Sequence, residues 1–333
     1  MKILLVNKYL YRKGGAETYF IKLGEYLKSL GNEVEYFGMA DERNCVGNRV
    51  EAYTENIDFH KKSLKHITYP FKIIYSVNAR KQIRKVLSDF KPDVVHLNNF
   101  NYQLTPSIIY EIKKHNIPIV YTAHDVQLVC PNHKLKNDYT DGLCRKCDGG
   151  KYFECVKNNC VHSSKIRSIL GAVEAWYYKL RHTYKMIDLT VCPSEFMEKE
   201  ISRNDDINGR TVTMYNFIDE IKPLGAECEN YVLYFGRYSE EKGISNLVKA
   251  AKKLSNIPFV FAGKGELENE VNSADNIKNV GFKTGDELRN IIEKALFTVL
   301  PAEWSENCPF SVMESQSLMT PVLGAKIGGI LEL

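Results

Sequence analysis

The chain alternates apolar runs of strand length with segments whose apolar residues recur at helical spacing, and this alternation constrains its fold most strongly. Residues 2–6 and 33–37 are strand-like, and a helical segment at residues 17–30 separates them. Two further apolar strands, at residues 92–97 and 117–125, also flank a helical segment. Consecutive strands that are connected through helices form a parallel sheet. The sequence therefore predicts an α/β fold.

A second α/β unit begins after a polar stretch with Pro and Gly at residues 222–230. Its expected strands are residues 231–235, 258–262, 279–282, 296–300 and 321–323. A chain of 333 residues is too long for one ordinary core and suits two domains. We place these domains at residues 1–220 and 221–333, with a cysteine-rich insertion at about residues 130–160 of the first.

Composition narrows the class of protein. With 44% hydrophobic and 26% charged residues, the chain reads as soluble and globular. It has no apolar run near the roughly 18 residues that a spanning helix needs, and its start lacks a signal-peptide core. We expect a cytoplasmic protein, with a peripheral contact at the inner face of the cell membrane as a further expectation. A net charge of +4 is too mild to predict a nucleic-acid partner.

Residues 60–87 form a basic, aromatic segment of predicted helix. They contain eight Lys or Arg and no Asp or Glu. This composition is typical of a helix that binds an anionic membrane surface. A solvated positive face explains it equally well, and both interpretations stay open.

Two carboxylates eight residues apart, Glu306 and Glu314, flank a predicted strand-to-helix turn. Pro309 stands where a first helical residue tolerates proline. The start of a helix attracts phosphate, and a carboxylate on either side can accept hydrogen bonds from the hydroxyl groups of a sugar. The motif predicts a pocket for a sugar nucleotide. The alternative is an exposed loop Glu together with a Glu that the helix dipole favours.

Other candidate ligand residues follow predicted strands. Gly14–Gly15 lead into a helix and would let backbone amides approach a phosphate, although a plain tight turn also explains them. Arg237 and Lys242 follow the strand at residues 231–235 and suit a diphosphate, with ordinary surface charges as the alternative. His124 lies just past the end of a strand, where open α/β sheets bind ligands, or is a structural histidine.

Five of the nine cysteines fall within residues 130–160, namely Cys130, Cys144, Cys147, Cys155 and Cys160. A reducing compartment favours metal ligation or free thiols over disulfides. Cys144 and Cys147 have the spacing of a metal knuckle. We expect these two, with two of the other three, to hold one structural zinc ion. Reduced thiols that are incidental to an inserted loop are the alternative.

Five motifs together resemble, in order and spacing, the retaining group 1 glycosyltransferases of the GT-B fold. They are residues 14–17, 216–219, 236–243, 262–265 and 306–314. The resemblance implies two Rossmann-like domains that face a cleft. Departures are Pro309 and Met319, where Gly is usual, and Leu331, where Pro is common. The family normally continues past the position of Leu333, so we expect the second domain to be incomplete.

The resemblance also implies roles for single residues. Glu314 would accept from the ribose hydroxyls, and Glu306, with the amides of Asn307 to Ser311, would hold the donor sugar; Phe310 lies within that run. Arg237 and Lys242 would neutralise the departing diphosphate, helped by the amides at Gly14 and Gly15, and His124 would reach the donor sugar near its reacting carbon.

The implied activity is transfer of a sugar from a nucleoside diphosphate sugar to a glycan or lipid-linked acceptor in cell-surface polysaccharide biosynthesis. No cofactor would be required for catalysis. Two alternatives remain: a nucleotide-sugar epimerase or inverting transferase of the same fold, and a non-catalytic module that binds a partner.

Overall fold

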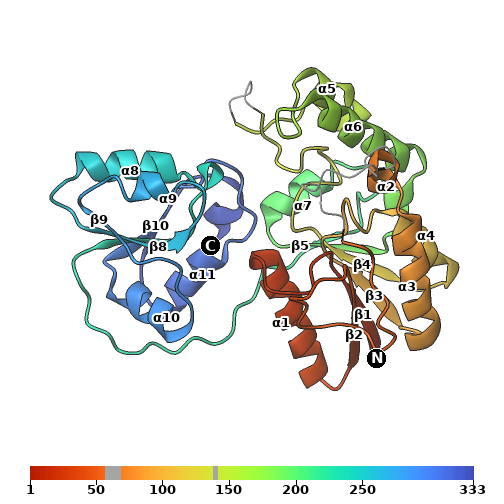
Figure 1. The fold of residues 1–333 in the computed structure, drawn as a ribbon, viewed down its shortest axis with the longest axis horizontal. Coiled ribbons are helices and arrows are strands. Elements are labelled where there is room, and N and C mark those ends of the chain that lie inside the picture. Colours follow the sequence, from red (N-terminus) through yellow and green to blue (C-terminus); the bar gives the residue numbers. More distant parts are fainter. Residues whose placement is uncertain (57–68, 138–141) are drawn as a thin grey trace. The chain divides into compact units, whose positions relative to one another are not determined.

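The structure, a computed structural model, describes residues 1–56, 69–137 and 142–333. It divides into two compact units, Met1–Tyr215 and Asn216–Leu333. Each unit contains its own parallel sheet with helices beside it (Figure 1). The two α/β units predicted from the alternation of strands and helices are therefore present.

The first unit is built on a six-stranded sheet of order β2-β1-β3-β4-β5-β6, in which all neighbours are parallel. Its strands are β1 Lys2–Val6, β2 Glu33–Phe37, β3 Val94–Leu97, β4 Ile119–Thr122, β5 Leu189–Cys192 and β6 Thr211–Thr213. From β1 the chain first adds a strand on one side and then builds outward on the other. The direction of winding thus reverses between β1 and β3.

Helices cover both faces of this sheet. The helices of this unit are α1 Gly15–Ser29, α2 Tyr69–Ile74, α3 Val77–Phe90, α4 Ser107–Lys114, α5 Phe153–Lys157, α6 Lys165–Leu180 and α7 Glu195–Ile201, with short 3₁₀ helices at Asp148–Gly150 and Thr183–Met186. On one face, Phe20 of α1 packs with Leu5 of β1. On the other face, Ile83 of α3 packs with Leu97 of β3. Figure 1 shows α1 on one side of the strands and α3 with α4 on the other.

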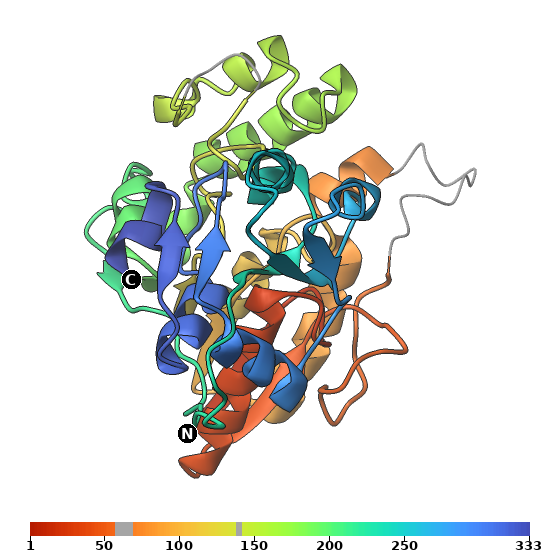
Figure 2. The ribbon, with the colours of Figure 1, turned by 90° about the vertical axis from the view of Figure 1, so that its left-hand side faces the viewer.

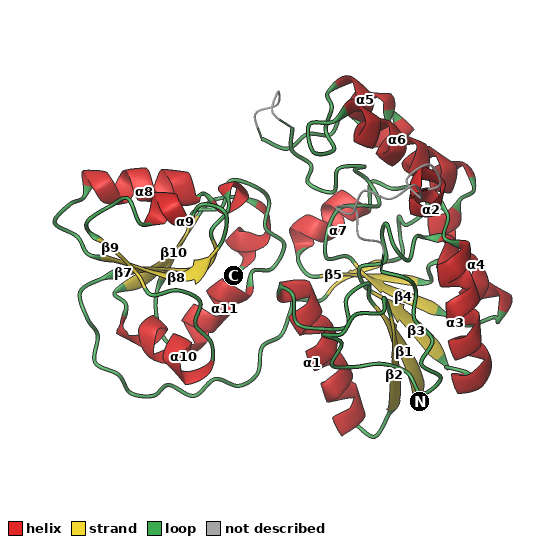
Figure 3. Ribbon diagram, viewed as in Figure 1, coloured by secondary structure: helices red, strands yellow, loops and turns green. Residues whose placement is uncertain are grey.

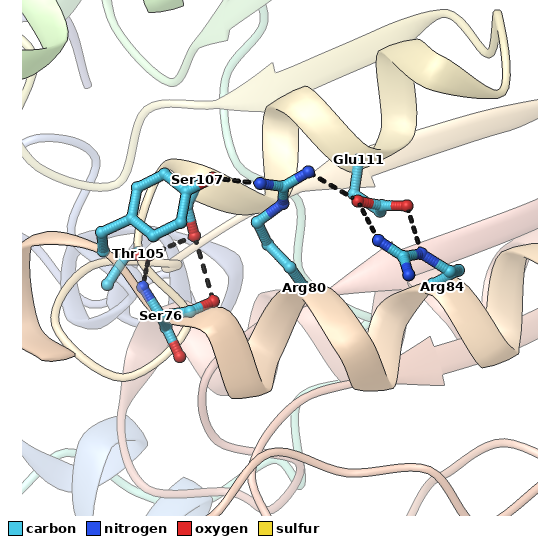
Figure 4. A network of polar contacts seen from close by, with 7 residues as sticks. Ser76, Arg80, Arg84, Thr105, Ser107 and Glu111 are labelled. Carbon is cyan, nitrogen blue, oxygen red and sulfur yellow. Dashed lines mark hydrogen bonds and ion pairs between the residues drawn. The ribbon is translucent and has the colours of Figure 1, made fainter.

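A buried carboxylate joins α3 to α4. Glu111 accepts from Arg80 Nη2 at 2.8 Å and from Arg84 Nε at 2.6 Å (Figure 4). Ser76 caps α3 by accepting from the Ala79 amide at 3.1 Å. Two cations of the basic segment at 60–87 therefore have a structural role, and the apolar residues of α3 from Ala79 to Phe90 are in the core. Residues 60–68 of that segment lie outside the described part of the chain.

The second unit is built on a five-stranded parallel sheet of order β11-β10-β7-β8-β9. Its strands are β7 Val232–Arg237, β8 Phe259–Lys264, β9 Ile277–Asn279, β10 Phe297–Leu300 and β11 Val322–Gly324. Its helices are α8 Ile244–Lys253, α9 Glu268–Val271, α10 Gly285–Lys294 and α11 Phe310–Ser317, with 3₁₀ turns at Glu240–Lys242 and Gly328–Glu332. Helices α8 and α9 cover one face of the sheet and α10 the other (Figure 3). The winding reverses between β7 and β10.

Helix α5 lies within the cysteine-rich stretch of the first unit, and α6 follows it. They pack against each other, and both views place them at the end of that unit that lies away from the N-terminus (Figures 1 and 2). Helix α6 also contacts α2, because the Tyr178 hydroxyl donates to the Ile74 carbonyl. Within residues 1–56, 69–137 and 142–333, no helix combines the length and the apolar character needed to cross a membrane.

Candidate functional site

The topology of the second unit selects one place for a ligand. Open α/β sheets bind ligands outside the carboxyl ends of their strands, at the point where the strand order reverses. In this unit that point lies between β7 and β10, which are hydrogen-bonded neighbours. Strand β7 ends at Arg237, the connection after it carries Lys242, and the connection after β10 carries Glu306. Predicted site residues that lie 64 positions apart in the sequence therefore meet at one sheet edge.

Lys242 and Glu306 form the centre of this site. Lys242 Nζ lies 2.5 Å from Glu306 Oε1, and Trp304 Nε1 donates to the same oxygen at 2.6 Å. The Glu306 side chain is only 11% exposed. A half-buried ammonium group beside a carboxylate offers a cation for phosphate and an acceptor for sugar hydroxyls within one small region.

Close backbone contacts fix both partners of this ion pair. Gly243 follows Lys242 with a φ of +73°, and a Cβ there would lie 1.9 Å from the Pro301 carbonyl oxygen. Only glycine tolerates that conformation and that contact together. Gly328 similarly packs against Glu306, where a Cβ would lie 2.3 Å from its carbonyl oxygen. The same oxygen accepts from the Gly329 amide at 2.8 Å.

Arg237 belongs to the same edge but does not join the Lys242–Glu306 pair. It lies at the end of β7, and its side chain is largely exposed. Its guanidinium approaches the Glu241 carboxylate at 3.9 Å. The group is therefore open to solvent, where a planar fork of donors can reach a phosphate.

Helix α11 carries the rest of the predicted motif. It begins at Phe310. Pro309, which was predicted to be the first helical residue, is instead the cap residue with extended backbone, one position before the helix. Glu314 is the fifth residue of the helix, half-buried and about a turn and a half inside. Asn307 precedes the helix and Ser311 lies in its first turn, both half-buried. A hydrogen bond of 3.0 Å from Thr298 to Ser315, between hydroxyl groups, ties α11 to β10.

Gly14, Gly15 and His124 belong to the first unit. Gly14 caps α1, and its carbonyl accepts from the Thr18 amide at 3.0 Å and from the Thr18 hydroxyl at 2.9 Å. His124 follows β4, and its Nε2 lies 2.8 Å from Asn98 Oδ1, beyond the end of β3. Burial lowers the pKa of His124 to about 4, so the imidazole is neutral at physiological pH.

A second polar cluster, at the carboxyl edge of the sheet in the first unit, was not predicted from the sequence. Lys8, just after β1, donates to Asn101 Oδ1 at 2.8 Å, and Asn101 Nδ2 lies 2.9 Å from His133 Nδ1. His133 in turn lies 3.4 Å from the Asp125 carboxylate. Three of these residues closely follow the ends of β1, β3 and β4, as His124 does. That position is the only sequence signal that could have singled them out, because they share no motif.

The structure gathers the five cysteines of the insertion around one small cavity. All are free thiols. Cys130 donates to Asn132 Oδ1 at 2.9 Å, and Cys144 accepts from Asn137 Nδ2 at 3.0 Å. Burial, followed by the neighbouring thiols, raises the pKa of Cys147 to about 12. In the part of the chain that the structure describes, no three His, Cys, Asp or Glu side chains are arranged to hold a metal ion. Zinc binding stays a prediction.

Comparison with known proteins connects this geometry to a family. Residues 13–221 match the family model of Glycosyltransferase Family 4, and residues 217–333 match Glycosyl transferases group 1. An uncharacterised 42.6 kDa protein of the cps region of Klebsiella pneumoniae is 26% identical over all of this chain and 87% of its own length. A putative teichuronic acid biosynthesis glycosyltransferase of Bacillus subtilis is 32% identical over 34% of this chain and 29% of its own length.

Among solved structures, the complex of Anabaena HepE with UDP-glucose superposes with a TM-score of 0.64. It is 16% identical, and the match covers all of this chain and 82% of that one. This likeness confirms the predicted fold of two Rossmann-like domains. Because the family 4 match spans more than half of the chain and the group 1 match spans its last 117 residues, the chain belongs to the glycosyltransferases, with a family 4 first part and a group 1 second part on the GT-B fold.

Proposed function

We propose that this glycosyltransferase is a retaining enzyme that moves a sugar from a nucleoside diphosphate sugar to a glycan or lipid-linked acceptor in cell-surface polysaccharide biosynthesis. The observation that carries the proposal is the Lys242–Glu306 pair at the reversal point of the second sheet. A similar fold binds UDP-glucose in HepE, so sugars linked to uridine diphosphate are the first donors to test.

The donor would lie across the carboxyl edge of the second sheet. Lys242 and the exposed Arg237 would contact the diphosphate, because both follow β7 and both are cations. Glu306, with the amides that begin α11, would hold the sugar. Glu314, deeper in that helix, would accept from the ribose hydroxyls. In this arrangement carboxylates contact the hydroxyl groups and cations contact the phosphates, which suits the charge of each group.

The chemistry then depends on stabilising charge rather than on a covalent intermediate. The bond between the sugar carbon and the diphosphate oxygen breaks, and negative charge grows on the diphosphate beside Lys242. The acceptor oxygen attacks from the same face, and its proton passes to the departing phosphate oxygen. Glu306 already accepts hydrogen bonds from Lys242 and Trp304, which favours a binding role for it over a nucleophilic one. Preorganised donors of this kind often supply the largest single contribution to catalysis.

The first unit would serve the acceptor. Its sheet edge carries neutral His124 and the cluster of Lys8, Asn101, Asp125 and His133. Such a mixture of donors and acceptors suits the hydroxyl groups of a glycan. His124 would reach the donor sugar near its reacting carbon, and the amides at Gly14–Gly15 would assist the diphosphate.

Release of free nucleoside diphosphate from a panel of uridine, guanosine and adenosine diphosphate sugars tests the proposal. A transferase releases the diphosphate faster when acceptor glycan or lipid is added, and it yields a glycosylated product. An epimerase changes the sugar without any dependence on acceptor. A binding module releases nothing above the blank, and that result would reject the proposal.

We also keep one structural zinc ion at the cysteines as a proposal, separate from catalysis. Its support is that Cys130, Cys144, Cys147, Cys155 and Cys160 line one cavity. A metal would fix a loop region by replacing weak thiol hydrogen bonds with metal–sulfur bonds.

A further inference from the structure

Helix α6 presents an apolar stripe to solvent. The stripe consists of Ile166, Ile169, Val173, Trp176 and Leu180, whose exposed fractions run from 40% to 84%. Successive members are three or four positions apart, so all five lie on one side of the helix. Exposed apolar patches on this scale mark interaction sites.

The stripe is separate from the face by which α6 joins the unit. The buried residues of α6 are Ser168, Ala172 and Tyr178, which lie on the other side of the helix. The helix thus attaches to the unit mainly through residues outside the stripe, with Trp176 as the exception. Trp176 is held in position, because its Nε1 donates to the Gly150 carbonyl at 2.9 Å. Phe153 of α5, which packs against α6, adds a further exposed apolar side chain.

Positive charge surrounds the stripe. Residues 151–185 contain seven Lys or Arg and two Glu. Lys165 and Arg167 lie exposed at the start of α6, and Arg181 and Lys185 lie exposed just past its end. Both ends of the stripe therefore carry exposed cations.

We propose that α6 lies in the headgroup region of an anionic lipid bilayer, with the stripe inserted among the acyl chains and the flanking cations on the lipid phosphates. Helices that lie on membranes have an apolar face with basic flanks. Tryptophan, with an apolar ring and a polar N–H, is enriched at that boundary. The inference stands independently of the donor site in the second unit.

The charges favour a bilayer over a second copy of the chain. A symmetric dimer brings the same surface of two subunits together. Since both ends of α6 are cationic, either a parallel or an antiparallel pair of α6 helices would place Lys and Arg against Lys and Arg. Anionic lipid neutralises the same cations.

Vesicle flotation of the full chain tests the inference. We expect binding to phosphatidylcholine vesicles that contain about 30% phosphatidylglycerol, weaker binding at high salt, and little binding to phosphatidylcholine alone. The double variant Ile166→Glu/Leu180→Glu should lower the partition coefficient about ten- to a hundredfold or more, because two apolar side chains no longer insert. A matched control adds the same charge at exposed apolar positions of the first unit outside both α6 and the basic segment at residues 60–87, as Leu30→Glu/Val50→Glu, and should float within about twofold of wild type.

Three further readouts complete the test. Lys165→Gln/Arg167→Gln should reduce flotation and its salt dependence. In a Trp304→Phe background, bromine-labelled lipids should quench Trp176, the one tryptophan that remains. Equal flotation of the Ile166→Glu/Leu180→Glu variant and its control would overturn the proposal. Light scattering without lipid gives the second contrary outcome: the wild type is a dimer, and Ile166→Glu/Leu180→Glu dissociates it while the control variant does not. The stripe would then bind a second copy of the chain, and the proposal would be overturned.

Discussion

Lys242 Nζ lies 2.5 Å from Glu306 Oε1, and this contact joins the connections that follow the two strands at which the second sheet reverses its winding. In the absence of a donor, each group neutralises the other. A diphosphate would compete with Glu306 for the ammonium group, while a sugar hydroxyl could donate to the carboxylate. The pair therefore keeps both groups in place until a ligand carrying both functions arrives.

Glu314 should contribute mainly to donor affinity. Contacts to a ribose persist unchanged into the transition state, so their loss weakens binding without slowing the chemical step. We expect Glu314→Gln to weaken binding of a nucleoside diphosphate by about 1.5 to 3 kcal/mol, the usual cost of a lost charged hydrogen bond. Titration calorimetry measures this effect. The exposed Glu287→Gln on α10 is the control. A drop in turnover with unchanged affinity would assign Glu314 a different role.

Gly243 should be replaceable only at a large cost in stability. Gly243 and Gly281 both have positive φ, at +73° and +71°, but a Cβ at Gly281 would meet nothing within 4 Å. Gly281→Ala should cost about 1 to 2 kcal/mol for the left-handed backbone alone. Gly243→Ala should cost roughly 1 to 3 kcal/mol more, because its Cβ would collide with Pro301. Chemical denaturation measures both losses of stability. If Gly243→Ala and Gly281→Ala lose the same amount, the close approach of Gly243 to Pro301 does not contribute to stability.

The ion pairs of Glu111 on α4 with Arg80 and Arg84 on α3 should make the stability of the fold depend on pH. Hydrogen bonds from Arg84 and then Arg80 hold the pKa of Glu111 at about 2, below its ordinary 4.5. A carboxyl whose pKa is lower in the folded state stabilises the fold at pH values above its pKa in the unfolded state. This stabilisation is lost as pH falls from about 4.5 toward 2. Glu111→Gln should therefore cost roughly 3 kcal/mol at neutral pH.

The difference between wild type and Glu111→Gln should shrink as the pH approaches 2, because the protonated wild-type carboxyl resembles the amide. Denaturant titrations across that pH range measure it. Glu287→Gln, which breaks an exposed pair with Lys283, serves again as the control and should change stability by less than about 1 kcal/mol. A difference that does not vary with pH would contradict this account.

The cysteine cluster should contain zinc in protein purified without added metal. We expect about one zinc ion per chain, bound by Cys144, Cys147 and two of the remaining three thiols. Replacing Cys144 and Cys147 by Ser should abolish metal binding, whereas replacing the exposed Cys228 of the second unit should not. Elemental analysis decides between the alternatives. Absence of zinc, with all five thiols reactive toward a thiol reagent, would reject the site.

The strands and helices could be predicted because their periodicity is local. The strand expected at residues 231–235 is β7 at Val232–Arg237, and the strand at 296–300 is β10 at Phe297–Leu300. Periodicity settles these features because it needs only neighbouring residues. Parallel strands place their following loops at one edge, so Lys242 and Glu306 could be expected at the same edge, but their direct contact was not predicted.

Tertiary partners were harder to predict. The basic composition of residues 60–87 left a membrane contact and a solvated face equally open, yet Arg80 and Arg84 bind Glu111, which is 27 or more positions away. Lys8 and Asn101 meet only because β1 and β3 are neighbours. The exposure of the stripe on α6 could not be predicted from its sequence either. A helical period shows that a face is apolar, but it cannot show whether another element covers that face.

The most direct test of the account is the turnover of Lys242→Ala with a sugar nucleotide and acceptor. Charge on the diphosphate grows in the transition state, so removing the ammonium group should lower kcat about 100- to 1,000-fold with a smaller effect on donor affinity. The control Lys253→Ala removes an exposed lysine from the end of α8 and should keep wild-type turnover. Turnover of Lys242→Ala within about threefold of wild type would remove Lys242 from the mechanism and contradict the proposed donor site.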